Sequence, residues 1–143
     1  MVDYRKQFHC DVLTPEKRLC SASTVSVVFP SSDGQVGILG GRAPMVARVG
    51  AGPLRVFLPD ESQECYYIAG GFAQMREDRL TILAEECIPV ADLSRKDAWN
   101  DVQKAKARPA GTRDEAVERA QAIHVARVKF RLSQGDVEAD RTS

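Results

Sequence analysis

The stretch from Val27 to Val56 limits the possible folds of this chain more than any other part of it. It holds six of the ten glycines and three of the seven prolines, placed between short apolar runs. Glycine and proline interrupt helices, and tight reversals need the positive φ that glycine adopts at little cost, so this alternation predicts strands joined by turns. Asp33-Gly34 is a two-residue turn signal, and the loop over 40–44 cannot continue either neighbouring strand.

Short strand patterns continue on both sides of this stretch. They cover 8–13, 19–29, 55–58, 64–69, 72–75 and 80–84, and polar or charged turns separate most of them. Many short strands without intervening helices favour an antiparallel β-sandwich or flattened barrel that ends near Cys87. We therefore predict a β domain over residues 1–89.

The composition changes beyond Pro89, where glycine nearly vanishes, alanine rises and charges become dense. A helix is expected from Asp92 to Ala107, N-capped by Asp92 or Ser94. Its apolar face is expected at Ala98, Val102 and Ala105. The residues Thr112-Arg113-Asp114-Glu115 have the pattern of a capping box that opens a second helix. The apolar stripe of that helix is expected at Ala116, Ile123 and Phe130, with Val117 and Ala120 beside it.

Two antiparallel helices over residues 90–143 would form a hairpin with a frayed tail after Leu132. The predicted fold class is therefore α+β and mainly β, with a β-sandwich followed by a helical hairpin. Because two thin apolar stripes bury little surface, this hairpin is expected to be marginally stable alone.

Short motifs at fixed spacing run through roughly the first ninety residues. They lie at 27–38, Gly41 with 43–45, Gly52 with 54–56, 70–72 and 80–84. This ordered set is similar to the epsilon subunit of the F-type ATP synthase, which is called delta in mitochondria. Two positions depart from the family pattern, because Gly40 stands where proline is usual and Arg42 where histidine is usual.

The resemblance implies roughly ten strands in two sheets and a non-catalytic subunit of the rotor, or central stalk. The sandwich would hold the gamma subunit on the ring of c subunits, and the hairpin would regulate the enzyme. The implied location is peripheral, on the cytoplasmic face of the bacterial inner membrane. The contact with the ring is expected at one end of the sandwich, from Gln35, Arg42, Ala43, Pro44 and Met45.

Two further sites follow from the same resemblance. Asp92 and Arg95 match the charged positions of a family motif that helps to bind ATP, whereas the flanking positions differ; the alternative is that Asp92 caps the helix and Arg95 is solvated. Basic residues of the second helix are expected to meet acidic surfaces of the catalytic alpha and beta subunits and to inhibit ATP hydrolysis. They are Arg119, Arg127, Lys129 and Arg131.

The composition argues against other classes of function. Twenty basic and twenty acidic residues cancel, so no overall field favours nucleic acid or an anionic membrane, and contact with the membrane is expected only through the complex. The chain has only two histidines, His9 and His124, four widely spaced cysteines, and neither a phosphate loop nor a His-x-x-x-His pair. We therefore expect no resident cofactor, no metal site and no enzymatic activity of its own.

Two alternatives remain at this point. The first is a free-standing β-sandwich that binds a small ligand and uses its helical tail for oligomerisation. The second is a metal-dependent β-barrel enzyme, which is disfavoured because two histidines cannot supply the usual set of ligands.

Overall fold

A computed structural model describes residues 6–135 of the chain. The fold divides into two compact units, with the boundary between Pro89 and Val90. No helix in the described part is long and apolar enough to span a bilayer.

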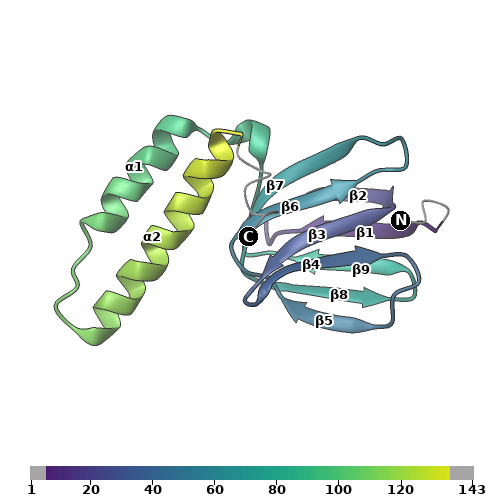
Figure 1. The fold of residues 1–143 in the computed structure, drawn as a ribbon, viewed down its shortest axis with the longest axis horizontal. Coiled ribbons are helices and arrows are strands. Elements are labelled where there is room, and N and C mark those ends of the chain that lie inside the picture. Colours follow the sequence, from purple (N-terminus) through teal and green to yellow (C-terminus); the bar gives the residue numbers. More distant parts are fainter. Residues whose placement is uncertain (1–5, 136–143) are drawn as a thin grey trace. The chain divides into compact units, whose positions relative to one another are not determined.

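The first unit is a sandwich of two five-stranded sheets, drawn in Figure 1. Sheet A contains, in spatial order, β2 (Arg18–Thr24), β1 (Phe8–Leu13), β9 (Arg79–Leu83), β8 (Phe72–Arg76) and β5 (Met45–Arg48). Sheet B contains β10 (Glu86–Pro89), β7 (Gln63–Ala69), β6 (Gly52–Phe57), β3 (Ser26–Ser31) and β4 (Gly34–Leu39). Neighbouring strands are antiparallel except β1 and β9, which are parallel. The predicted sandwich of about ten strands is therefore confirmed.

The core lies between the inner faces of the two sheets. Strand residues alternate between the two faces of a sheet, so Phe8, Cys10 and Val12 of β1 point inward together and are buried. Leu54 of β6 and Ile82 of β9 are also fully buried in this cluster. Each such side chain contributes about 1.5–3 kcal/mol on burial, which gives the sandwich a rigid centre.

Two details of the sandwich differ from the sequence-based prediction. The strand expected over 19–29 is two strands, because the chain leaves sheet A after Thr24 and enters sheet B at Ser26, with the Val25 amide bonded to the Phe57 carbonyl at 2.9 Å. Val25 itself is apolar and buried, so the crossing has neither a glycine nor a proline nor an exposed turn residue to mark it. The hairpin turn consists of Ser32 and Asp33, and Gly34 is the first residue of β4, with φ +124°.

The second unit is a helical hairpin that follows the short 3₁₀ helix η1 (Val90–Asp92). Helix α1 (Arg95–Lys106) begins after Ser94, whose side chain accepts a hydrogen bond from the Asp97 amide at 3.2 Å. Ser94 is therefore the N-cap, whereas Asp92 lies in η1. Helix α2 (Arg113–Ser133) opens with the predicted capping box, in which Thr112 and Glu115 exchange bonds of 3.1 Å.

The two helices pack through one small apolar cluster. Val102 and Ala105 of α1 meet Ala126 of α2, and three partly buried residues surround them: Ala122, Ile123 and Phe130. The predicted stripe is thus correct at Ile123 and Phe130.

The predicted stripe is wrong in the first turns of α2, where Ala116 and Ala120 are exposed and Val117 is 63% exposed. Arg119 is already level with Lys106, the last residue of α1, since its guanidinium bonds the Lys106 carbonyl. The earlier turns of α2 therefore extend past the end of α1 and have no helix to pack on, as Figure 1 shows. Helix α2 continues to Ser133, and residues 136–143 of the predicted frayed tail lie outside the described residues.

Candidate functional site

The loop over 40–44 joins β4 and β5, which are edge strands of the two sheets. Arg42, Ala43 and Pro44 are exposed on it, whereas Met45 begins β5 and packs against the core cluster. The Gly41 amide donates a hydrogen bond to the Asp78 carboxylate at 3.0 Å, which ties the loop to the turn between β8 and β9. The loop is thus exposed and held at both sides, as a rigid contact surface needs to be.

The glycines of this loop make room for another part of the chain. A Cβ atom at Gly40 would lie 2.7 Å from Cγ of Lys6 and 2.8 Å from its carbonyl oxygen, a separation too short for any side chain. Gly41 has φ +80°, a conformation that glycine adopts at little cost. The close approach of Lys6 accounts for glycine, rather than the usual proline, at position 40.

Arg42 is attached to the sandwich edge. Its Nη1 donates a hydrogen bond to the Gly37 carbonyl of β4 at 3.0 Å, which satisfies an acceptor on an edge strand. A guanidinium has five N–H donors, so most of them stay available to a partner. Arg42 therefore offers an oriented positive charge at this edge.

Gln35 does not lie beside the other predicted ring-contact residues. It is the second residue of β4, whereas Arg42, Ala43 and Pro44 follow the last residue of that strand. At about 3.3 Å per residue, Gln35 and Leu39 are roughly 13 Å apart along the edge. The prediction that all five residues gather at one end of the sandwich is wrong, because the length of β4 separates Gln35 from the loop over 40–44.

An apolar patch on the outer face of sheet A is a surface that the sequence did not identify. Val46 of β5, Phe72 of β8 and Leu83 of β9 are 69%, 51% and 55% exposed. Phe72 pairs with Leu83 on one side and with Arg48 on the other, and the Arg48 guanidinium lies 5.8 Å from the centre of the Phe72 ring. We call these four residues the outer patch. The sequence Phe72-Ala73-Gln74-Met75 could have indicated this patch. Successive residues of a strand face opposite sides of the sheet, so Phe72 lies on the outer face when Ala73 and Met75 are buried.

A polar network lies on the same face of sheet A. Asp11 contacts Nε2 of His9 at 3.1 Å and Nη1 of Arg79 at 2.9 Å, and Ser21 lies 3.1 Å from the same His9 nitrogen. A side-chain hydrogen bond with Ser21 is the main cause that lowers the pKa of Asp11, and His9 and Arg79 lower it further. His9 is therefore part of a network that joins β1, β2 and β9.

The β-sandwich unit matches a known family along almost its whole length. The family model described as "ATP synthase, Delta/Epsilon chain, beta-sandwich domain" matches residues 7–90. The chain belongs to the delta/epsilon family of ATP synthases. The family predicted from the sequence motifs is therefore confirmed.

Named relatives agree with this family. The chain is 37% identical to an ATP synthase epsilon chain of Granulibacter bethesdensis, over 71% of this chain and 75% of the relative. It is 34% identical to that of Rhodopirellula baltica, over 87% of this chain and 97% of the relative. A chain in the structure of the Euglena gracilis mitochondrial ATP synthase, comprising OSCP, F1 and c-ring, has the same fold, with a TM-score of 0.75 at 18% identity over 85% of this chain and 78% of that one.

Asp92 and Arg95, the two residues predicted to bind ATP, lie at the start of the hairpin. Asp92 ends η1 and Arg95 begins α1, and both are exposed. Arg95 lines a cleft of about 570 Å³ together with Lys96, Trp99 and Phe130. The Trp99 and Phe130 rings are 5.3 Å apart between centres and tilted by 53°. We call this the aromatic cleft; Asp92 is not among its lining residues.

The four basic residues predicted on α2 do not share one face. Arg119 and Arg127 line one cleft beside Lys106, whereas Lys129 lines a different groove with Lys104 and Arg108. At 100° per residue, Arg119, Arg127 and Arg131 fall within about 120° of one another, and Lys129 lies outside that sector. Within residues 6–135, no group of three or more His, Cys, Asp or Glu side chains could hold a metal ion.

Proposed function

We propose that this chain is the non-catalytic epsilon subunit of the central stalk of an F-type ATP synthase, where it links the gamma shaft to the ring of c subunits for ATP synthesis coupled to ion transport. The match of its sandwich to the delta/epsilon family over residues 7–90 carries the proposal. Its membrane contact would be indirect, through the complex, on the cytoplasmic face of a bacterial plasma membrane. The two bacterial relatives support that location.

The outer patch is the surface we assign to the gamma subunit. Contiguous exposed apolar side chains on a sheet are characteristic of a protein interface, and aromatic and arginine side chains such as Phe72 and Arg48 contribute most to interfaces. Behind the patch, Ala73 and Met75 are fully buried. A rigid, close-packed support of this kind transmits torque with little deformation.

The edge of β4 is the surface we assign to the ring. Gln35 and Arg42 lie toward opposite ends of this strand. Both can therefore contact the ring only if the whole edge of β4 lies against the ring, and not if the loop over 40–44 alone contacts it. The charge of Arg42 would suit an acidic loop of a ring subunit. Ala43, Pro44 and Met45 would extend the contact toward β5.

The test is co-elution of the full chain with its cognate gamma subunit in size-exclusion chromatography. We expect a one-to-one complex, and we expect Phe72→Ser to weaken it about tenfold or more, as removal of an interface anchor does. Leu39→Ser is the matched control, because Leu39 is also an apolar strand residue, 44% exposed, but lies on β4. If the unaltered chain elutes alone, the central-stalk proposal fails and the ligand-binding module becomes the better explanation. If both variants bind equally, gamma does not bind the outer patch.

The aromatic cleft supports a second proposal, that ATP binds the hairpin as a regulatory ligand. Trp99 and Phe130 offer ring faces to a base, and Arg95 and Lys96 offer cations to phosphates. ATP should quench the fluorescence of Trp99, the only tryptophan, and Arg95→Gln should weaken binding about tenfold, whereas Lys104→Gln should not. Unchanged fluorescence and no heat at millimolar ATP would remove this proposal.

We also propose that the hairpin inhibits ATP hydrolysis through the basic residues of α2. Arg119, Arg127, Lys129 and Arg131 would meet acidic surfaces of the catalytic alpha and beta subunits in the assembled enzyme. The acidic first turn of α2, with Asp114 and Glu115, and its basic end concentrate positive charge toward the end of that helix.

A further inference from the structure

The turn between β8 and β9 is built by two residues in an uncommon backbone conformation. Glu77 and Asp78 have φ values of +52° and +57°, and Arg76 pairs with Arg79 across them. Positive φ at both central residues is typical of the tightest β-hairpin turns. Aspartate adopts this conformation more readily than most residues other than glycine. The Asp78 side chain therefore extends from a closely defined position on the backbone.

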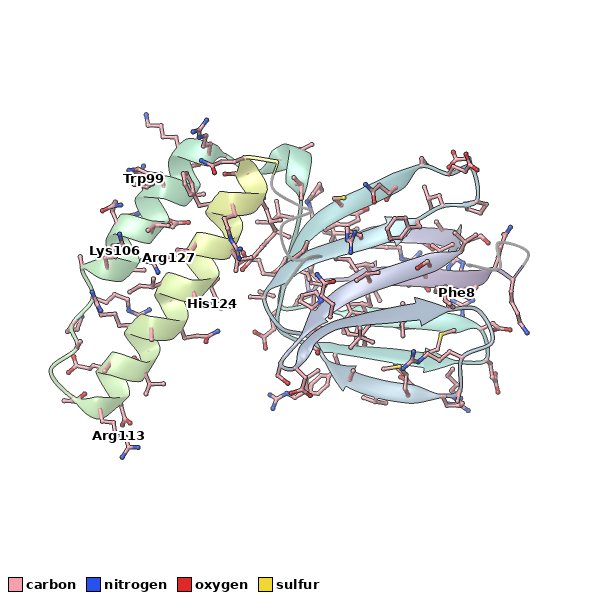
Figure 2. The ribbon with its side chains drawn as sticks, in the orientation of Figure 1. Phe8, Trp99, Lys106, Arg113, His124 and Arg127 are labelled. Carbon is pink, nitrogen blue, oxygen red and sulfur yellow. The ribbon has the colours of Figure 1, made fainter. Side chains whose placement is uncertain are left out.

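Asp78 forms hydrogen bonds through both its backbone and its side chain. Its carbonyl accepts a bond of 3.0 Å from the His9 amide, near the start of β1, where Figure 2 labels Phe8. Its carboxylate accepts a bond of the same length from the Gly41 amide. The backbone bond holds Asp78 to β1, and the side-chain bond holds the loop over 40–44 to Asp78.

The loop over 40–44 needs such a restraint because it begins with two adjacent glycines. Gly40 and Gly41 have no side chains to limit their backbone, and glycine loses more conformational freedom on ordering than any other residue. A larger residue cannot replace Gly40 without displacing Lys6, whose Cγ and carbonyl oxygen lie against it. The order of this loop must therefore come from hydrogen bonds to neighbouring parts of the sandwich.

Two hydrogen bonds of the loop have different anchors. Arg42 donates to the Gly37 carbonyl, which belongs to β4, the strand that the loop leaves. Gly41 donates to Asp78, which lies 37 residues further along the chain, in the turn between two strands of sheet A. The bond to Arg42 thus orients one side chain, whereas the bond to Asp78 fixes the backbone of the loop against sheet A.

The hairpin that carries Asp78 also carries part of the outer patch. Phe72 of β8 and Leu83 of β9 are paired across the two strands, at the opposite end of the hairpin from Asp78. Figure 1 shows β8 and β9 side by side in sheet A. The surface assigned to gamma and the loop assigned to the ring are therefore joined through one pair of antiparallel strands.

We propose that Asp78 is a positioning residue for the ring contact. Its carboxylate holds Gly41 in the conformation that the ring binds, and it ties the loop over 40–44 to the strands of the outer patch. This inference rests on the proposed contacts of the central stalk, and Asp78 itself need not touch the ring. Without the carboxylate, the two glycines would sample other conformations, and binding would have to remove that freedom at a cost in affinity.

The test measures how tightly the complex of the full chain with its cognate gamma subunit binds the purified cognate ring in detergent, by biolayer interferometry. Asp78→Ala should weaken binding about fivefold, the usual effect of one lost hydrogen bond. Asp78→Asn should restore most of the affinity, because its amide oxygen accepts the same bond and asparagine also tolerates positive φ. Glu77→Ala is the matched control, since Glu77 is the other exposed, positive-φ residue of the turn.

Two further measurements separate positioning from general stability. Hydrogen exchange of the Gly41 amide, followed by NMR on the free chain, should become faster in Asp78→Ala and stay slow in Asp78→Asn and Glu77→Ala. Binding of gamma should be the same for all variants, because the outer patch is unchanged. Thermal denaturation verifies that each variant is folded.

The outcomes distinguish this inference from the ring assignment on which it rests. Weaker ring binding and faster Gly41 exchange in Asp78→Ala alone support the role of Asp78. If the unaltered complex does not bind the ring, the proposed ring contact fails, and the role of Asp78 fails with it. If the unaltered complex binds and every variant binds equally well, only the role of Asp78 is overturned. Equal weakening by Asp78→Ala and Glu77→Ala also overturns it, because the cause would then be the turn and not the bond to Gly41.

Discussion

Asp11 is an ionised side chain whose neighbours stabilise the folded sandwich. Its contacts with Ser21, His9 and Arg79 lower its pKa in the folded state. A carboxylate with a lowered folded pKa adds stability above its unfolded pKa, about 3.9, and this stability is lost as the pH falls through the folded value. Asp11→Asn should therefore lower the free energy of unfolding by about 1 kcal/mol at pH 7, and by progressively less as the pH falls below about 3.9.

Urea denaturation of the Asp11→Asn variant across this pH range measures the effect. Asp33→Asn is the control, because Asp33 is an exposed turn residue whose side chain has no such partners among residues 6–135. A loss of stability that is the same at pH 7 and pH 3 would contradict an electrostatic origin and indicate lost packing instead.

At the same scale, the sequence predicted the loop over 40–44 but not what each of its residues touches. Glycine and proline identified the loop because their backbone preferences are local. The approach of Lys6 to Gly40 and the bond from Arg42 to Gly37 depend on how strands far apart in the chain are brought together. For the same reason, the separation of Gln35 from Arg42 could not be predicted without the exact limits of β4.

At the scale of elements, prediction succeeded where the signal is local. The capping box of Thr112 and Glu115 is read from four neighbouring residues and is present as predicted, and of the two N-caps predicted for α1, Asp92 or Ser94, the structure has Ser94. The hairpins of the sandwich follow from turn residues and the two-residue alternation. The crossing from β2 to β3 was missed because buried Val25 continues the apolar pattern across it.

The packing face of α2 shows the limit of periodicity. Ala116, Ile123 and Phe130 recur every seven residues, so each of them qualified as a core position. Which turns are covered depends on the length of the partner helix, and α1 ends level with Arg119. The periodicity of one helix carries no information about where its neighbour ends. The sequence alone therefore could not distinguish the exposed Val117 from the residues of α2 that pack on α1.

At the scale of the whole molecule, the outer patch of the sandwich arises from the order of the strands in sheet A. Val46, Phe72 and Leu83 look like ordinary strand residues in the sequence, and only the sheet order shows that they share the outer face of sheet A. The hairpin differs in kind, since it has a small apolar cluster and many exposed charges. The rigid sandwich is suited to a contact that is always made. The thinly packed hairpin is suited to a contact that forms and breaks.

The proposed contact between the cations of α2 and the catalytic subunits can be tested in the assembled enzyme. If the hairpin inhibits hydrolysis by charge attraction, removal of exposed cations from α2 should weaken the inhibited state. Exposed ion pairs contribute about 0.5 kcal/mol each, so the double variant Arg127→Ala, Arg131→Ala should raise the rate of ATP hydrolysis about twofold to fivefold. ATP synthesis should change little, because the sandwich contacts are kept.

The matched control changes Lys104 and Arg113 to alanine, which removes the same charge from other exposed positions of the hairpin. Rates are measured with the reconstituted complex at low and at high salt. Activation by the Arg127, Arg131 variant alone, diminishing as salt screens the attraction, supports inhibition by these residues. Equal rates for both variants at low salt would mean that this hairpin does not restrain hydrolysis through its basic face.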